Sequence, residues 1–145
     1  MKQIILYGTG NSGKTTTLYK FYDKHIKDNS EFTVSEIKFS GKDYMAIVEY
    51  HGYKIGIYTW GDTKKLIEDG GKYTKECDII ICTARSKGKG YQYFDKLTVP
   101  QIWIEMGRFY NQNSAIADSD YESFRNAITD QAADRVYQAL KLLCK

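Results

Sequence analysis

Proline, histidine and cysteine are scarce in this sequence, and long hydrophobic runs are absent. Proline occurs once in 145 residues, at Pro100, and no repeat or low-complexity tract is present, which argues against an internal linker. No apolar run approaches the roughly 18 residues needed to cross a bilayer. The apolar stretch before Gly8 is too short for a secretory signal. We therefore expect a single cytoplasmic domain over 1–145, with no membrane partner.

The few cysteines and histidines argue against a disulfide framework and against a zinc site. The three cysteines, Cys77, Cys82 and Cys144, are odd in number and lack C-x-x-C spacing. Cys77 and Cys82 bracket an apolar run, which is typical of buried thiols in a reducing compartment. The two histidines, His25 and His51, lie far apart in the sequence.

A large excess of charge of either sign is also lacking. Lysine and arginine number 21 against 18 acidic residues, a net charge of +3. This mild excess is not the electrostatic footprint of a nucleic-acid-binding protein, so nucleic acid is not the expected partner. The positive charge gathers between Arg85 and Lys89, in the segment "TARSKGKG".

The apolar pattern predicts strands that alternate with helices. Short apolar runs are typical of buried parallel strands, and longer segments with apolar residues every three or four positions are typical of helices. The first predicted helix has this spacing at Leu18, Tyr22 and Ile26, and the apolar face of the last is Phe124, Ile128, Ala132, Val136, Ala139 and Leu143. His51-Gly52 is typical of a tight hairpin turn, and Ser119 with Glu122 of a helix capping box. The expected buried strands are 3–7, 77–82 and 99–105, the expected hairpin region is 31–39, 44–50 and 53–60, and the expected helices are 13–26, a short stretch from Asp62 to Gly70, and 119–143.

This order predicts an α/β fold, a three-layer α/β/α sandwich. Its sheet is mostly parallel, with one antiparallel edge hairpin. Ligands of such sheets bind beyond the carboxyl ends of the strands. Gly8, Asp62, the segment 83–90 and Glu105 all follow predicted strands, and we therefore expect them at one end of the sheet.

The segment "GTGNSGKT" carries the most specific chemistry. Gly8, Gly13, Lys14 and Thr15 fit the pattern G-x-x-x-x-G-K-[ST] between a predicted strand and a predicted helix. Glycines let the backbone curl around an anion, the helix adds the positive end of its dipole, Lys14 reaches phosphate oxygens and the Thr15 hydroxyl binds Mg²⁺. The other residues expected to bind the cofactor or line the loop are Thr9, Gly10, Asn11, Ser12 and Thr16.

Over residues 4–27 the sequence resembles the P-loop NTPases, through their Walker A motif. The resemblance implies the P-loop NTPase fold and the binding of a nucleoside triphosphate with Mg²⁺. It also implies a carboxylate that holds the metal after a neighbouring strand.

Asp62 is the first candidate for that carboxylate. "IGIYTWGD" resembles the second switch region of small GTPases, although the D-x-x-G order of that region is absent. Asp62 is equally suited to cap the short helix that follows it. Glu105, at the end of "QIWIE", is the reserve candidate.

Base preference rests on a missing motif. Guanine-specific GTPases carry N/T-K-x-D after a late strand, whereas this chain has Glu105 to Arg108, "EMGR", after Ile104. ATP becomes the expected nucleotide by elimination. Tyr91, Tyr93, Phe109 and Tyr110 are the candidates for stacking on adenine.

The basic segment after 77–82 is the last candidate feature. A mobile cationic loop at the ligand end of the sheet stabilises the charge that develops in phosphoryl transfer. Arg85, with its bidentate guanidinium, is the expected catalytic cation beside Lys14 and Asp62. The alternative is a solvated connection, which is what charge runs usually are.

The sequence thus predicts binding of Mg²⁺–ATP with slow hydrolysis, because no residue stands out to orient an attacking water. Three alternatives stay open. One is a small nucleotide-kinase-like phosphotransferase with the basic loop as its lid, and another is a nucleotide-responsive module that recruits a protein partner. The third, although nucleic acid is not the expected partner, is a nucleic-acid-binding protein that uses the basic segment from Arg85 to Lys89 and surface tyrosines.

Overall fold

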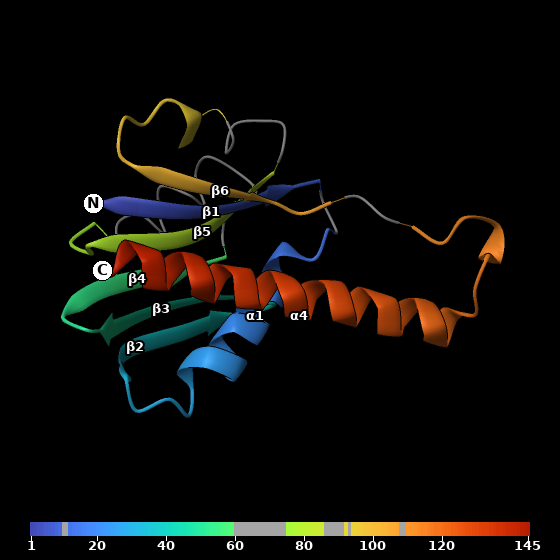
Figure 1. Ribbon diagram of the computed structural model, residues 1–145, viewed down its shortest axis with the longest axis horizontal. Helices are drawn as coiled ribbons and strands as arrows, with labels where there is room; N and C mark the ends of the chain where they lie inside the picture. Colours follow the sequence, from blue (N-terminus) through green and yellow to red (C-terminus); the bar gives the residue numbers. More distant parts are fainter. Residues whose placement is uncertain (10–11, 60–74, 86–91, 93, 108–109) are drawn as a thin grey trace.

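A mixed six-stranded sheet forms the centre of the computed structural model, which describes residues 1–9, 12–59, 75–85, 92, 94–107 and 110–145. The strand order is β2-β3-β4-β5-β1-β6 (Figure 1). β1 pairs in parallel with β5 and β6, and β4 pairs in parallel with β5. Only β3 runs the other way, antiparallel to β2 and to β4. The strands are β1 (Lys2–Gly8), β2 (Phe32–Ser40), β3 (Asp43–Tyr50), β4 (Tyr53–Tyr58), β5 (Ile79–Arg85) and β6 (Gln101–Glu105).

The expected hairpin is confirmed at the turn between β3 and β4. His51 has φ 49° and Gly52 has φ 83°, two left-handed residues in a two-residue connection. Such a turn matches the twist of antiparallel strands. A second tight connection, at Gly41 and Lys42, joins β2 to β3.

The strand expected at 99–105 is present as β6, but it is less buried than predicted. β6 is half-buried rather than fully buried, because among the described strands it lies at one edge of the sheet and pairs with β1 alone. β1 and β5, which have neighbours on both sides, match the expectation of buried strands. Cys77 and Cys82 are buried as expected, and burial raises the pKa of the Cys82 thiol to about 12.

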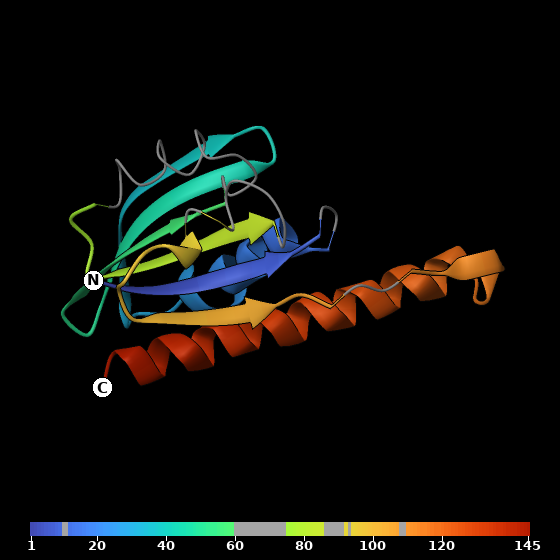
Figure 2. The ribbon, with the colours of Figure 1, turned by 90° about the horizontal axis from the view of Figure 1, so that it is seen from above.

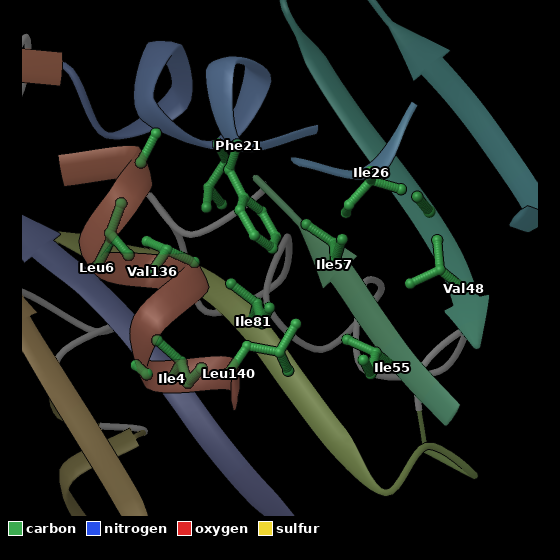
Figure 3. Close-up of a cluster of buried hydrophobic side chains, with 14 of the residues drawn as sticks. Ile4, Leu6, Phe21, Ile26, Val48, Ile55, Ile57, Ile81, Val136 and Leu140 are labelled. Carbon is green, nitrogen blue, oxygen red and sulfur yellow. The ribbon is translucent and has the colours of Figure 1, made fainter. Parts of the chain in front are cut away.

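The longer helices lie against one face of the sheet. α1 (Lys14–Phe21) continues into a π-helical turn, η1 (Tyr22–Ile26), and α4 (Asp118–Leu143) crosses the same face (Figures 1 and 2). In Figure 3 Leu140 of α4 lies beside Ile4 of β1, within one buried apolar cluster. A short 3₁₀ turn, η2 (Gln112–Ser114), precedes α4.

The opposite face carries a second buried cluster. Ile5, Met45, Tyr58 and Cys82 are at most 2% exposed there, and Phe94 packs with them. Among the described elements, α1, η1 and α4 cover only the first face. The structure therefore establishes an α/β fold with a mostly parallel sheet. The short helix expected from Asp62 lies outside the described residues.

The start of α4 corrects the predicted capping box. The helix begins at Asp118, its N-cap is Ala117, and no side chain caps it. Ser119 therefore lies inside the first turn, where its carbonyl accepts a hydrogen bond from Ser123 Oγ. On the predicted apolar face, Ala132, Val136 and Ala139 are buried, whereas Phe124 is 50% exposed.

Candidate functional site

The turn from β1 into α1 is tightly wound at its described residues. The Ser12 amide donates to the Thr9 carbonyl at 3.3 Å, and Gly13 follows with φ 89° as the N-cap of α1. The Thr17 amide then donates to the Gly13 carbonyl at 2.8 Å, so α1 is hydrogen-bonded from its first turn. The first amides of a helix have no partner within the helix, and those of α1 lie at this turn. Gly10 and Asn11 lie outside the described residues.

Two glycines of the motif are required by their surroundings. A Cβ at Gly8 would lie 2.8 Å from Ser12 Oγ and 3.0 Å from the Met106 carbonyl oxygen. A Cβ at Gly13 would lie 2.9 Å from Thr129 Cγ2, and its positive φ disfavours any other residue. The motif thus fixes the approach of α1 to α4 as well as the curl of the loop.

Lys14 and Ser12 are the buried polar side chains of this turn, 7% and 6% exposed. The Lys14 ammonium folds back over the loop and donates to the carbonyls of Gly8 at 3.1 Å and Thr9 at 2.9 Å. Ser12 Oγ has no hydrogen-bond partner among the residues that the structure describes. A buried hydroxyl without a partner is costly, and it marks this turn as a place where a polar ligand atom is favourable.

A cleft of about 740 Å³ opens at this turn, at the carboxyl edge of the sheet. We call it the basic cleft, because its described lining holds four cationic side chains and a single carboxylate, that of Asp43. This charge balance favours a multiply charged anion. The lining is Ser12, Gly13, Lys14, Thr15, Thr16, Tyr19, Lys42, Asp43, Arg85 and Arg125.

The structure brings Arg85 to the motif, as the sequence predicted. Arg85 ends β5 and stands opposite Gly8 in the parallel register of β5 and β1. Glu105 pairs with Tyr7 on the other side of β1 and is not part of the described lining of the basic cleft. Asp62 and the rest of the basic segment, 86–90, lie outside the described residues.

Asp43 is a carboxylate that sequence reasoning missed. It begins β3, and since β3 runs against its neighbours, its first residue lies at the edge where the parallel strands end. Thr59, just past β4, donates from Oγ1 to Asp43 Oδ1 at 2.8 Å and accepts from the Tyr44 amide at 3.0 Å. The Thr83 hydroxyl in turn donates to the Thr59 carbonyl at 2.9 Å. A chain of bonds across three strands therefore holds the carboxylate in place.

Two tyrosines near Asp43 stay neutral. Burial, and then the negative charge of Asp43, raise the pKa of Tyr19, which lines the basic cleft. Burial raises the pKa of Tyr44 well above its ordinary value, and its hydroxyl donates to the Leu18 carbonyl at 2.6 Å. A neutral phenol at Tyr19 does not add negative charge to the cleft.

Arg125 is the second missed residue. It belongs to the amino half of α4 and lines the basic cleft. About 110 residues separate Arg125 from the motif, and no spacing rule joins them. Tyr110, the one described candidate for stacking on a base, is 64% exposed and lies outside the described lining.

Among the described residues, no group of three or more histidine, cysteine or acidic side chains is placed so that it could hold a metal ion. Among the described helices, none combines the length and apolarity of a membrane span. Comparisons with family models, with curated proteins and with solved structures found no match to this chain. The functional argument therefore depends on the geometry of the basic cleft.

Proposed function

We propose that this chain binds a nucleoside triphosphate with Mg²⁺, with ATP preferred, and hydrolyses it slowly. The observation that carries the proposal is the basic cleft. A strand, a tight turn with a left-handed glycine and a helix amino end open directly into it. Lys14, Lys42, Arg85 and Arg125 gather there from four different elements or turns. Such an arrangement stabilises the several negative charges of a triphosphate through amides and cations together.

Oxygen donors suited to Mg²⁺ line the same cleft. Thr15 supplies a hydroxyl and Asp43 a carboxylate, and Mg²⁺ characteristically binds one or two protein oxygens plus substrate phosphates. Asp62 remains the sequence-based candidate for the same role, and Asp43 is the candidate that the described cleft adds. Bound there, the ion would neutralise phosphate charge.

Slow hydrolysis follows from the small number of acceptor groups. Attack of water on the terminal phosphorus needs a group that orients the water and accepts its proton. Asp43 is the one carboxylate in the described lining, and its Oδ1 already accepts from Thr59. Once Asp43 serves the metal, that lining offers no second carboxylate as a general base.

The same proposal includes the finer fold, a three-layer P-loop NTPase sandwich in a cytoplasmic protein. The strand–turn–helix unit of β1 and α1 supports it, as does the helical layer on one face. The second buried cluster supports it too, since Ile5 and Cys82 on the other face are 0% exposed.

Calorimetric titration tests the binding. We expect Mg²⁺–ATP to bind wild type with micromolar affinity (about −8 kcal/mol). Lys14→Ala should weaken it about a hundredfold or more, because a charge-assisted contact with phosphate is lost. Lys24→Ala is the matched control, since it removes one lysine charge from a side chain 49% exposed and outside the cleft lining. Absence of binding by ATP and GTP to a folded wild type would refute the proposal.

Turnover then separates the alternatives. Phosphate release from ATP without an added acceptor supports slow hydrolysis. Transfer that requires an acceptor indicates a phosphotransferase, and tight binding without any turnover indicates a nucleotide-responsive module.

A further inference from the structure

A second pocket, of about 520 Å³, adjoins the basic cleft across the amino end of α1. It shares Gly13, Thr16 and Arg125 with that cleft. A ligand bound at the motif can therefore extend past Thr16 into this space, which we call the α4 pocket. Its volume lies in the range of small-molecule sites. The remaining lining comes from α4: Asp118, Tyr121, Glu122, Asn126 and Thr129.

The lining follows the geometry of the helix. Asp118, Glu122 and Asn126 are spaced by four residues and form one row on α4. They belong to the amino half of the helix, which projects past the edge where β1 and β6 end (Figures 1 and 2). Thr129 closes the row against Gly13. This stretch of α4 is thus a wall of the α4 pocket as well as a packing element.

The chemistry changes between the two spaces. The basic cleft is lined by cations that stabilise phosphate, whereas the α4 pocket adds two carboxylates and no further cation beyond Arg125 in its described lining. Ionised carboxylates only accept hydrogen bonds, and they repel additional phosphate groups. A ligand that occupies both spaces needs a phosphate end and a neutral end rich in N–H or O–H donors. A nucleotide has both.

We propose that the α4 pocket binds the nucleoside part of the nucleotide. This inference rests on the proposed function. Asp118 and Glu122 accept hydrogen bonds from the hydroxyl or amino donors of the nucleoside. The half-buried ring of Tyr121 provides the surface for the base. The polyphosphate then runs from Thr16 toward Lys14 and Asp43.

Inorganic triphosphate separates this site from the phosphate site, because it carries no nucleoside. We expect wild type to bind ATP or GTP, with Mg²⁺, more tightly than inorganic triphosphate. Glu122→Ala should lower the affinity for the preferred nucleotide about tenfold or more, since it removes an acceptor for charge-assisted hydrogen bonds. The same variant should leave the affinity for inorganic triphosphate unchanged or slightly higher.

Asp120→Ala is the matched control. Asp120 is exposed, lies in the same part of α4 and carries the same charge, yet it is outside the pocket's lining. Its substitution should not lower the affinity for either ligand. Tyr121→Ala should reduce nucleotide affinity alone, and Tyr121→Phe should preserve it.

The following results would overturn the assignment of the α4 pocket or the proposed function. Equal loss of nucleotide and triphosphate affinity in Glu122→Ala, or no loss of either, overturns the assignment of the α4 pocket while the proposed function stands. Binding of nucleotide and triphosphate with equal affinity by wild type does the same. Failure of wild type to bind any of these ligands overturns the proposed function, and this inference with it.

Discussion

The two halves of α4 serve different purposes within one continuous helix. In the carboxyl half, Ala132, Ala133, Val136 and Leu140 are buried against the sheet. In the amino half, every residue from 118 to 127 is exposed except the half-buried Tyr121, and burial begins with Ile128 and Thr129. The carboxyl half stabilises the fold, whereas the amino half lines the basic cleft and the α4 pocket. A helix face that the core does not need is available to contact a ligand.

Lengths explain this division. α4 has 26 residues and β1 has 7, which correspond to about 39 Å of helix and about 23 Å of strand. A helix that packs along such a strand has several turns left over. These turns project past the carboxyl edge of the sheet (Figure 2), and their residues share a pocket lining with Gly13 and Thr16 of the motif and α1.

The largest effect on stability is expected in the buried half. Leu140 is 0% exposed and packs in the helix-side cluster (Figure 3). Leu140→Ala should lower the free energy of unfolding by about 2–5 kcal/mol, through lost burial and the cavity left behind. Urea denaturation measures it, with the exposed Gln138→Ala as a control that should stay within about 0.5 kcal/mol of wild type. A Leu140→Ala effect as small as that of the control would contradict the division of α4.

The opposite pattern is expected for the projecting half. Arg125→Ala should leave the free energy of unfolding within about 0.5 kcal/mol of wild type and weaken Mg²⁺–ATP binding about tenfold, because Arg125 lines both ligand spaces. Arg135→Ala removes the same charge from an exposed position in the carboxyl half. Equal effects of the two variants on ATP affinity would show that only the overall charge matters.

The sequence predicted the parts of this molecule whose signals are local. The motif from Gly8 to Thr15 and the turn at His51-Gly52 are each specified within a few residues, and the structure shows a tight turn at both. Asp43 was missed for a topological reason. It is the first residue of its strand, and only the reversed direction of β3 brings it to the ligand edge.

Long-range packing explains the other features that could not be predicted from the sequence. Arg125, Tyr121 and Glu122 reach the motif only because α1 and α4 pack together, with Gly13 against Thr129. Edge position likewise affects burial. The pattern of "QIWIE" predicts a buried strand, yet among the described strands β6 has one neighbour, β1, and is half-buried. The spacing of residues along the chain specifies neither which strands pair with each other nor how two helices pack.

The smallest effect is expected where the buried half of α4 meets η1. Asp134 Oδ1 lies 2.8 Å from Lys24 Nζ and 2.8 Å from His25 Nε2. The hydrogen bond from Lys24, and then that from His25, lower the pKa of the Asp134 carboxyl below its ordinary value of 3.8. A carboxyl whose pKa is lower in the folded state stabilises the fold above its unfolded pKa, and this contribution is lost as the pH falls through the folded pKa.

The contribution is small because the Asp134 side chain is 43% exposed and solvent screens the pair. Wild type should therefore be slightly more stable than Asp134→Asn at pH 7, and the difference should vanish as the pH falls below 3.8 toward the lowered pKa. NMR titration of the Asp134 carboxyl carbon in wild type and in Lys24→Ala measures the cause directly. We expect the midpoint to rise in Lys24→Ala, since the largest cause of the shift is removed. An unchanged midpoint would show that Lys24 does not lower the pKa of this carboxyl. The contact between η1 and α4 would then depend on apolar packing and on the stacking of His25 against Tyr137, whose ring centroids are 4.4 Å apart.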